Sequence, residues 1–521
     1  MELKPPLTPR PEQEYAIERI LAEPTRAALV ADEVGFGKTL IASEVALRAE
    51  WTRVLIIGIV DTLKQWDETI QRQSAGAAPR LRKLDSTKAG RANFEDFLAG
   101  AEGFFFAGIQ WLQAQDFQYR DKLDDEGNPI EKINKKTGEP TGKFERERVH
   151  LRTFAKMSAR KSGGLDAVIY DEAHQSCNYK SITRRTLMTL RGRDGEQAFK
   201  IGLSATWSGN SFENAWSIPN WLWPDLIPPY WEWRDTWVKL VPAKNADGKD
   251  VYVGGKQIME VAGEKEPAGT FAKSLPLYLR REQDDRPPEA LKVYVDSTPE
   301  QAGQYAELKA DLMTWAMGWE GEREPLVIDI PPALRMRLRQ VALAELSLDE
   351  AGGVVFAPEA KSAKLQALKG LLEHWGDQPV VLFTDSKLFA NLTAARMKAA
   401  GYSVEAWTGD TSREDRQRIK EAFIAGEIQY IVGTVQSMGT GLDGLQLVCS
   451  KAIWLSVPDG DPKLYTQALG RVFRPGRTMQ YGDFQHVQLL MRDSLDVETL
   501  DRLLAKGRMI QDSIGAAATA A

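Results

Sequence analysis

A glycine-rich stretch near the start of the chain, residues 31–39 (ADEVGFGKT), joins an apolar run to a helical pattern. The run 27–30 predicts a buried strand, and the apolar positions between 40 and 46 predict a helix. Glycines at such a turn allow backbone N–H groups to surround an anion, which the positive end of the helix dipole also attracts. The stretch therefore predicts a phosphate site between a strand and a helix.

Two side chains of this stretch suit a nucleotide. Lys38 is placed to reach the β- and γ-phosphates, and the Thr39 hydroxyl is placed to bind Mg²⁺. Asp32 stands where the strict P-loop pattern has a glycine. Taken alone, the stretch therefore also fits an ordinary glycine-rich turn.

Composition limits the class of protein. A chain of 521 residues is too long for one core and predicts two to four domains. No apolar run approaches the roughly 20 residues that span a bilayer. The first residues lack a secretion signal, so we expect a cytoplasmic protein. Two distant cysteines, Cys177 and Cys449, and four scattered histidines argue against a disulfide framework or a metal cluster.

A basic segment interrupts the first half of the chain. The net charge of −6 does not itself indicate a nucleic-acid binder, but local patches decide phosphate binding. Ten lysines and arginines lie between residues 132 and 161, against three glutamates. We expect an insertion over about 116–162, for which two interpretations stay open: a solvated surface segment or a DNA-facing arm.

Strand and helix patterns alternate in both halves of the chain. The runs 54–57, 103–107 and 167–170 predict strands in the first half, and 380–383, 429–432 and 452–455 in the second. This alternation predicts an α/β fold with two parallel-sheet lobes. We expect lobe 1 at 1–225, a helical insert and linker at 226–355, and lobe 2 at 356–521, which ends in a helix.

Candidate catalytic groups follow predicted strands. Asp171 and Glu172 come directly after the strand 167–170, at the sheet edge where open α/β folds bind ligands. Asp171 is the candidate Mg²⁺ ligand, and Glu172 the group that orients or deprotonates the attacking water. The alternative is an acidic pair that caps the next helix. After a further strand, Ser204 and Thr206 are candidates to link the nucleotide site to the lobe interface.

The second lobe lacks a phosphate loop, so we expect the nucleotide between the lobes and a positive charge from the second lobe. Arg471 and Arg474, three residues apart on a predicted helix, are the candidates to contact the γ-phosphate. A solvated basic helix face is the alternative.

In order along the chain, these motifs resemble those of the Swi/Snf-type ATPases of helicase superfamily two. Residues 32–39 are similar to that family's D-E-M-G-L-G-K-T, which has aspartate in place of the glycine. Other segments of this chain also resemble motifs of that family: 10–13 (RPEQ), 62–66 (TLKQW), 171–181, 203–210, 279–281 (LRR), 334–341, 361–365 (KSAKL), 434–443 and 467–474. The resemblance implies two RecA-like lobes that use ATP and Mg²⁺.

The resemblance also implies roles for individual residues. Gln13 would recognise adenine, with further nucleotide contacts from Arg10, Asp32, Glu33, Gly35, Gly37, Gly441, Asp443 and Gln467. DNA contacts would come from Lys64, Gln65, Thr434 and Ser437, and His174 would join Ser204 and Thr206 in coupling. Departures are Ser-Ala-Thr at 204–206 for T-G-T, Asp443 for asparagine, and a missing proline around 59–60. The first two are common in strand-separating relatives.

Tryptophans are concentrated just after the first lobe's last motif. Residues 207–237 contain Trp207, Trp216, Trp221, Trp223, Trp231, Trp233 and Trp237. Such residues either anchor packing or stack on unpaired bases, and the sequence leaves both interpretations open.

We expect a monomeric DNA-dependent ATPase that translocates on double-stranded DNA and remodels forks, branched DNA or protein–DNA complexes. The alternatives are a strand-separating DNA or RNA helicase of the same superfamily, a motor subunit of a restriction or repair complex, and a DNA-binding scaffold that binds ATP without hydrolysing it. The compact chain further suggests a bacterial or phage protein of DNA repair or replication.

Overall fold

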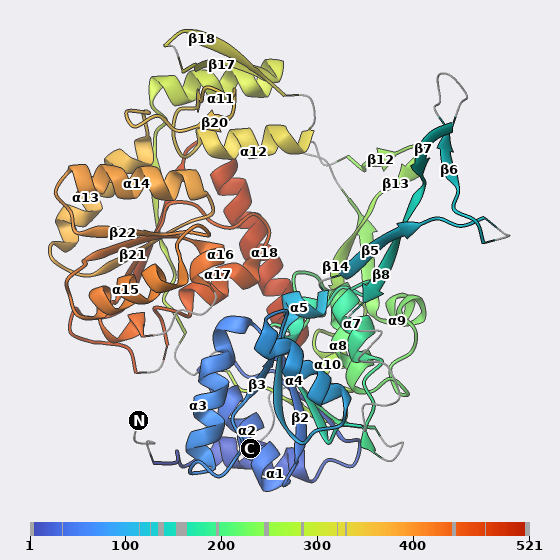
Figure 1. Cartoon of the computed structure of the whole chain (residues 1–521). Helices are drawn as coiled ribbons and strands as arrows, with labels where there is room; N and C mark the ends of the chain where they lie inside the picture. The colour runs from blue at the N-terminus through green and yellow to red at the C-terminus, as the bar shows by residue number, and fades with distance from the viewer. Residues whose placement is uncertain are drawn as a thin grey trace. The chain divides into compact units, whose positions relative to one another are not determined.

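The computed structural model describes residues 5–515 except 34, 114, 125–126, 134–139, 153–163, 194–196, 244–248, 283–285, 320, 329–330, 440–443 and 475. The chain forms two compact units, drawn in Figure 1. Unit 1 comprises Met1–Glu282 and Ser513–Ala521, and unit 2 comprises Gln283–Asp512. Each unit is built on its own parallel sheet, which confirms the predicted α/β class.

Unit 1 contains a seven-stranded parallel sheet in the order β15-β1-β10-β9-β2-β4-β3. The strands are β1 (Ala27–Val30), β2 (Arg53–Gly58), β3 (Arg82–Leu84), β4 (Gly103–Gly108), β9 (Ala167–Asp171), β10 (Phe199–Leu203) and β15 (Tyr278–Leu279). Every residue of β1, β2, β4, β9 and β10 is buried. This burial explains why these strands are continuous apolar runs in the sequence.

Several helices of unit 1 pack against this sheet or against one another. Helices α1 (Pro11–Leu21), α2 (Lys38–Arg48) and α3 (Leu63–Gln73) pack in sequence order, while α4 (Lys88–Leu98) packs on β3 and α8 (Ser217–Leu222) on β1 and β10. The other described helices of unit 1 are η1 (Val60–Thr62), α5 (Ile109–Gln113), η3 (Ala173–Ser176), α7 (Ile182–Leu187), η5 (Phe212–Trp216), α9 (Tyr230–Trp237) and α10 (Thr270–Lys273).

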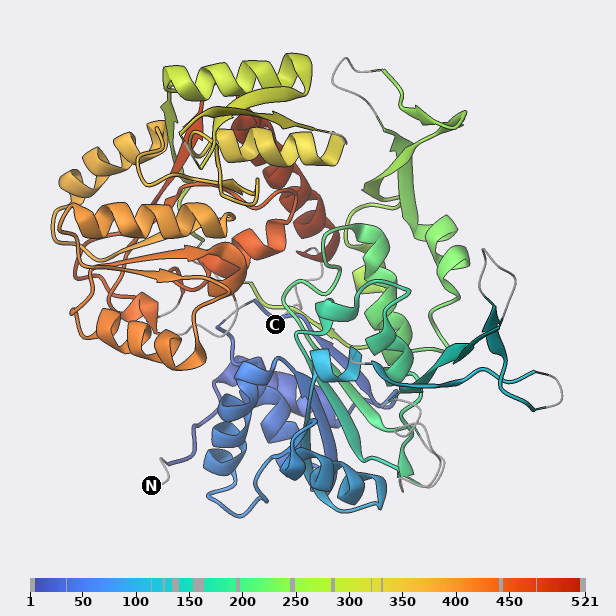
Figure 2. The ribbon, with the colours of Figure 1, turned by 45° about the horizontal axis from the view of Figure 1, so that its top comes forward.

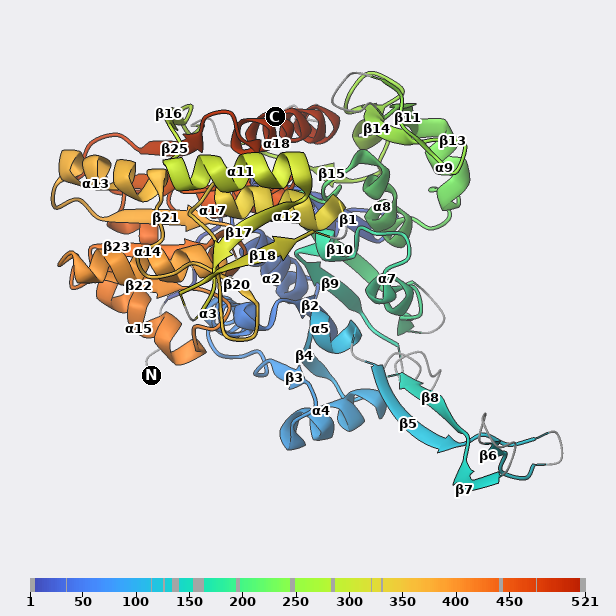
Figure 3. The ribbon, with the colours of Figure 1, turned by 90° about the horizontal axis from the view of Figure 1, so that it is seen from above.

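The predicted basic insertion is an antiparallel ribbon. Strand β5 (Gln115–Asp121) pairs with β8 (Arg146–Arg152), and β6 (Glu131–Ile133) pairs with β7 (Pro140–Phe144). Figures 2 and 3 show this teal ribbon leading away from β4 and the sheet of unit 1. Half of its ten basic residues lie outside the described part of the chain: Lys135, Lys136, Lys156, Arg160 and Lys161.

The segment 226–355 contains more strands than its helical pattern suggests. Besides α9 and α10 it holds α11 (Pro299–Asp311) and α12 (Pro331–Val341). Its strands are β11 (Val238–Pro242), β12 (Tyr252–Val253), β13 (Lys256–Gln257), β14 (Met259–Glu264), β15, β16 (Leu291–Val295), β17 (Met313–Met317), β18 (Arg323–Val327), β19 (Ser347–Leu348) and β20 (Val354–Val355). Most are two to six residues long, and β15 and β16 are edge strands of the two large sheets. Strands this short give little local signal.

Unit 2 contains a six-stranded parallel sheet in the order β16-β25-β24-β21-β23-β22. Its remaining strands are β21 (Val380–Thr384), β22 (Val404–Trp407), β23 (Tyr430–Thr434), β24 (Lys451–Trp454) and β25 (Gln485–Met491). Val380 and Leu382 of β21 pack with α13 (Ala363–Trp375) and α14 (Lys387–Ala399). Val381 and Phe383 pack on the other face, in a cluster with Ile419 and Phe423 of α15 (Arg413–Ile424). Figure 1 shows α14 and α15 on opposite sides of this sheet.

The remaining helices of unit 2 are α16 (Val435–Met438), η6 (Leu445–Leu447), α17 (Pro462–Leu469) and α18 (Leu495–Gly515). A smaller sheet, β18-β17-β19-β20, packs against α11. Across the described part of both units, we find no helix with the length and apolar character needed to cross a membrane.

A buried ion pair joins α13 to α18. Lys364, from the segment 361–365, is fully buried, and its Nζ lies 2.6 Å from Asp496 Oδ2 and 2.7 Å from the carbonyl oxygen of Leu455. The Asp496 carboxylate also accepts the backbone N–H of Met491 at 2.9 Å. Lys364 thus has a structural position inside unit 2.

We predict that Asp496→Ala lowers the free energy of unfolding by about 3–5 kcal/mol, because it leaves a buried ammonium group without its counter-charge. Asp410→Ala removes an exposed ion pair with Lys387 and should cost at most about 1 kcal/mol. Urea titrations followed by tryptophan fluorescence measure both. Equal losses in the two variants would contradict the structural role of the buried pair.

Candidate functional site

The strand order of the unit 1 sheet brings the predicted site residues together at the carboxyl ends of neighbouring strands. Strands β1, β10 and β9 are neighbours and parallel, so their carboxyl ends lie side by side. The phosphate loop follows β1, Ser204 follows β10, and Asp171 ends β9. Parallel strands are therefore what bring these three distant segments together.

Gly37 begins α2 in a left-handed conformation, with φ of +76°. A Cβ atom there would lie 2.5 Å from Gln13 Nε2, so a larger residue would clash as well as strain the backbone. No side chain of the described residues caps this helix, and its first-turn N–H groups remain available to an anion.

Lys38 folds back over the phosphate loop. Its Nζ donates hydrogen bonds to the carbonyl oxygens of Asp32 at 2.8 Å and Glu33 at 3.2 Å. Burial lowers the pKa of Lys38, while the nearby carboxylates of Glu172, Asp32 and Asp171 act in the opposite direction. The lysine and the acidic motif are therefore within electrostatic reach of each other, as the predicted site requires.

Arg281 holds Asp32, and it is one of two adjacent arginines to which the sequence analysis assigned no role. Asp32 is fully buried, and its Oδ1 accepts hydrogen bonds from Arg281 N at 2.9 Å and Nε at 3.0 Å, while Arg281 Nη2 pairs with Oδ2. Arg280, 2% exposed, donates to the carbonyl oxygens of Ala31 at 3.0 Å and Ala205 at 3.2 Å. The pairing of β15 with β1 brings both arginines to the loop.

Gln13 and Arg10 contact the same loop. Gln13 Nε2 donates to the carbonyl oxygen of Phe36 at 2.8 Å, and Gln13 Oε1 accepts the backbone N–H of Arg10 at 2.9 Å. The guanidinium groups of Arg10 and Arg281 lie 5.8 and 5.5 Å from the centre of the Phe36 ring. Gln13, the predicted adenine-reading residue, and Arg10, a predicted nucleotide contact, thus lie directly beside the phosphate loop.

Trp66 positions the candidate metal ligand, a contact that the sequence analysis missed. The indole Nε1 of this buried residue donates to Asp171 Oδ2 at 3.0 Å, and Asp171 Oδ1 accepts the backbone N–H of Glu172 at 3.0 Å. Burial, reinforced by the charge of Glu172, raises the pKa of Asp171 to about 6, whereas the Trp66 hydrogen bond favours the ionised form. The sequence places Trp66 in the helix that follows β2. Its contact with Asp171 arises because β2 lies next to β9 in the sheet.

Glu172, His174 and Ser204 form a connected set. His174 Nδ1 lies 3.1 Å from Glu172 Oε2 and 2.9 Å from Ser204 Oγ. Ser204 Oγ also accepts the backbone N–H of Thr206 at 3.2 Å, while the buried Thr206 hydroxyl has no partner among the described residues. Glu172 has a φ of +51°, an uncommon backbone state for a non-glycine residue that is found at functional sites. The three predicted coupling residues therefore do meet beside the acidic motif.

These groups suit ATP with Mg²⁺. Thr39 and Asp171 offer hard oxygen ligands, and Mg²⁺ in such sites takes its other ligands from phosphates and water. Among the described residues, we find no cluster of three or more His, Cys, Asp or Glu side chains that could hold a metal ion.

The second lobe's arginines lie beyond the predicted helix. Helix α17 ends at Leu469, and Arg471 and Arg474 occupy the turns after it: Gly470 N still donates to Thr466 O, four residues back, whereas Arg471 N donates to Ala468 O, three residues back. Arg471 donates from Nε and Nη2 to the carbonyl oxygen of Gly439, at 3.2 and 2.7 Å. The shared helical face predicted for the two arginines is therefore wrong.

Gln467 lies on α17, which packs against α16. Gly441 and Asp443, the other predicted nucleotide contacts of unit 2, lie outside the described residues.

The predicted DNA contacts fall on two surfaces. Lys64 and Gln65 are exposed on α3, where Lys64 Nζ lies 3.7 Å from Glu68 Oε1. In unit 2, Thr434 donates its hydroxyl to Ser437 Oγ at 2.8 Å. Both residues line a pocket of about 460 Å³ that also includes Asp385, Lys387, Gly409, Val435, Gln436, Pro458, Asp459, Asp461 and Leu464.

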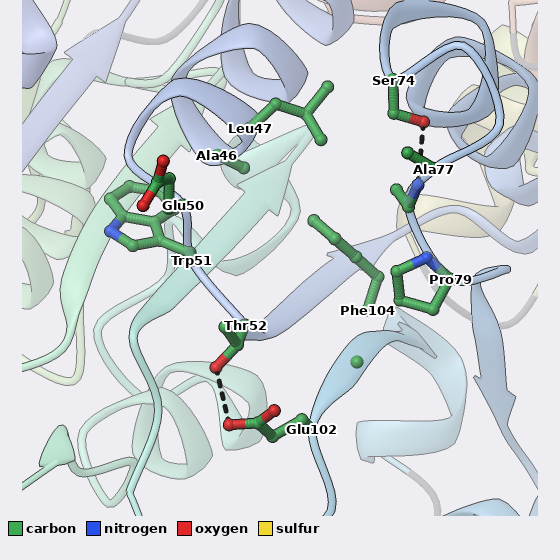
Figure 4. A pocket seen from close by; sticks show the side chains of 12 residues that line it. Ala46, Leu47, Glu50, Trp51, Thr52, Ser74, Ala77, Pro79, Glu102 and Phe104 are labelled. Carbon is green, nitrogen blue, oxygen red and sulfur yellow. Dashed lines mark hydrogen bonds between the residues drawn. The ribbon is translucent and has the colours of Figure 1, made fainter.

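A different pocket of about 410 Å³ lies at the amino ends of β2 and β4, away from the phosphate loop. Leu47, Trp51, Pro79 and Phe104 line it in Figure 4, where Thr52 donates its hydroxyl to Glu102 at 3.0 Å. None of the predicted site residues lines this pocket.

Comparison with known families places the two sets of motifs in two conserved domains. The family model described as the res subunit of type III restriction enzymes matches residues 6–209, and the model of the helicase conserved C-terminal domain matches residues 363–476. The first match contains Lys38 and Asp171, and the second contains Arg471 and Arg474.

Curated relatives match over short segments. The ATP-dependent RNA helicase DBP5 of Kluyveromyces lactis is 31% identical over 123 residues, 23% of this chain and 25% of that protein. The RNA helicase CrhR of Synechocystis is 30% identical over 109 residues, 21% of each protein. The chain thus spans about a quarter of the length of the curated relatives it matches.

Among solved structures, the chain is similar to the Sulfolobus solfataricus SWI2/SNF2 ATPase core in complex with dsDNA. The identity is 18% and the TM-score is 0.37, with 99% of this chain and 95% of that chain covered.

We predict that the apparent affinity for Mg²⁺ falls as the pH drops through about 6, because a protonated Asp171 cannot bind the metal. Trp66→Phe removes a hydrogen bond to the ionised carboxylate and should move this midpoint to a higher pH. ATP hydrolysis measured against Mg²⁺ concentration at several pH values tests this. Trp233→Phe is the matched control, because the indole N–H of this buried residue has no partner among the described residues. Identical midpoints in all three proteins would contradict the role of Trp66.

Proposed function

Because this chain belongs to the ATPases of helicase superfamily two, we propose that it is a DNA-dependent motor that couples ATP hydrolysis to translocation on double-stranded DNA. The contact between Asp32 and Arg281 carries this proposal. It joins two segments, 32–39 and 279–281, whose sequences both resemble Swi/Snf-type motifs. The aspartate in the phosphate loop is buried, and Arg281 supplies the counter-charge that a buried carboxylate needs.

In this proposal, ATP binds at the carboxyl ends of strands β1, β10 and β9 of unit 1. Lys38 contacts the β- and γ-phosphates, Gln13 recognises the adenine, and Arg10 contributes a further nucleotide contact. Mg²⁺ bound by Thr39 and Asp171 would neutralise charge on the phosphates. Glu172 accepts a proton from the attacking water, and its contact with His174 supports its orientation toward that water.

Hydrolysis in this proposal also needs unit 2. Arg471 and Arg474 stabilise the negative charge that develops on the γ-phosphoryl group, an effect that is large in related phosphoryl transfers. Three further residues of unit 2 would also contact the nucleotide: Gln467, Gly441 and Asp443.

DNA would be held through its phosphates. Lys64 and Gln65 on unit 1 and Thr434 and Ser437 on unit 2 are the proposed contacts, and their exposure or pocket position supports this assignment. Phosphate contacts carry little sequence information, so selectivity for DNA sequence should be low. Such a motor would remodel forks, branched DNA or protein–DNA complexes.

A strand-separating DNA or RNA helicase is the second candidate. The Ser-Ala-Thr sequence at 204–206 and the short matches to RNA helicases favour it. The res-subunit match is also compatible with a motor that works inside a restriction or repair complex.

We predict that duplex DNA stimulates ATP hydrolysis more than single-stranded DNA or RNA does. Rates are measured without nucleic acid and with single strands, blunt duplex, fork, four-way junction and RNA, all at one salt concentration. Glu172→Gln should lower kcat by about 10²–10⁴-fold while ATP still binds. Stimulation by single strands alone, with fork opening but no triplex displacement, would replace the translocase with the second candidate.

A further inference from the structure

An aromatic cluster lies on unit 1 shortly after the acidic motif. The rings of Tyr179 and Tyr230 are stacked, with centroids 4.1 Å apart and an angle of 4°. The plane of the Trp231 ring is steeply inclined to the planes of both tyrosine rings, with centroid distances of 5.9 Å to Tyr179 and 4.9 Å to Tyr230. We call these three residues the aromatic platform. Their mutual contacts fix the direction of the Trp231 ring.

Packing explains most tryptophans of the 207–237 segment but not Trp231. Five of them are buried: Trp207, Trp216, Trp221, Trp223 and Trp233. Trp233, for example, packs against Phe212 and Phe271, whereas Trp231 on the same helix is 61% exposed. A large, rigid and exposed indole that does not fill a core suits contact with a partner.

Cationic side chains accompany the aromatic platform. Lys180 Nζ lies 5.2 Å from the centre of the Tyr179 ring, is exposed and has no carboxylate partner among the described residues. Arg234 Cζ lies 5.7 Å from the centre of the Trp231 ring and pairs with Glu213 at 3.6 Å. Further charges nearby in the sequence are Arg184 and Arg185 on α7, which follows Lys180, and Glu232 and Asp235 on α9. Lys180 is therefore a cation available to an anionic ligand.

The aromatic platform rests on elements that continue from the nucleotide site. Ser217 Oγ donates to the carbonyl oxygen of Ser176, the last residue of η3, at 2.7 Å. The neighbouring Trp216 ring contacts Tyr230 edge-on, with centroids 5.5 Å apart. η3 begins directly after Glu172. The aromatic platform is thus linked, through Trp216 and Ser217, to the segment that follows the candidate catalytic carboxylate.

We propose that the aromatic platform stacks on an unpaired nucleobase while Lys180 contacts an adjacent phosphate. This inference rests on the proposed nucleic-acid-dependent function and adds a preference to it. The exposed Trp231 indole and the available ammonium group of Lys180 both lie against the Tyr179 ring, which is an arrangement suited to base stacking together with phosphate binding. Bases inside an intact duplex are not accessible to such a ring, so the platform selects nucleic acid that has an unpaired segment.

Binding of labelled nucleic acid by the full chain tests this proposal. The probes are a blunt duplex, a fork of the same duplex with DNA arms, and a fork with RNA arms. Trp231→Ala should weaken binding to at least one fork about tenfold and leave blunt-duplex binding unchanged, since one stacked base is lost. Trp231→Phe should keep most of the affinity. The matched control is Trp319→Ala, which removes an indole that is 70% exposed in unit 2.

A second variant tests the phosphate contact. Lys180→Ala should lower the slope of log affinity against log salt by about one for the fork. The two forks show whether DNA or RNA supplies the base. Fork binding by Trp231→Ala equal to that of the unaltered protein would overturn the platform, even if nucleic acid stimulates ATP hydrolysis. If fork binding falls as expected but no nucleic acid stimulates hydrolysis, the platform stands and the proposed motor function fails.

Discussion

A buried carboxylate fixes the phosphate loop of unit 1. Removing a carboxylate from water costs several kcal/mol unless a counter-charge and hydrogen bonds replace the solvent. Arg281 supplies both to Asp32, from a position 249 residues further along the chain. The contact that holds the loop in this conformation therefore requires β15 to pair with β1 at the edge of the sheet. The predicted nucleotide site thus depends on two segments that are far apart in the sequence.

Each carboxylate of the acidic motif is likewise held by a different element. Asp171 accepts a hydrogen bond from Trp66 of α3, and Glu172 contacts His174, which also contacts Ser204 after β10. Such indirect support keeps catalytic groups in a productive geometry. It also means that residues without any chemistry of their own can alter the site.

Local sequence patterns were sufficient for the central strands and for the strand, turn and helix around the glycine-rich stretch. Strands such as β1 and β9 are buried on both faces and therefore appear as apolar runs. Edge strands such as β15, with two residues, leave no such pattern, and their partners are distant in sequence. The roles of Trp66 and Arg281 depend on those long-range pairings, so the sequence pointed to their motifs but not to their contacts.

Two further features of the structure were not predicted from the sequence, and each has a physical cause. A three-residue spacing indicates a shared face only inside a helix, and α17 ends before Arg471. The 207–237 tryptophans are alike in sequence, yet burial separates Trp231 from Trp233 on one short helix. Exposure is a property of the packed structure and cannot be read from residue type.

The most direct test of the account concerns the arginines of unit 2. Arg471→Ala and Arg474→Ala are compared with Arg477→Ala, a neighbouring arginine that lies over the Phe473 ring. ATP binding and single-turnover hydrolysis are measured for each. The account predicts that ATP affinity changes little in all three, while the hydrolysis rate falls about 10³–10⁵-fold in the first two alone. Undiminished hydrolysis in both Arg471→Ala and Arg474→Ala would contradict the claim that a site in unit 1 needs charge from unit 2.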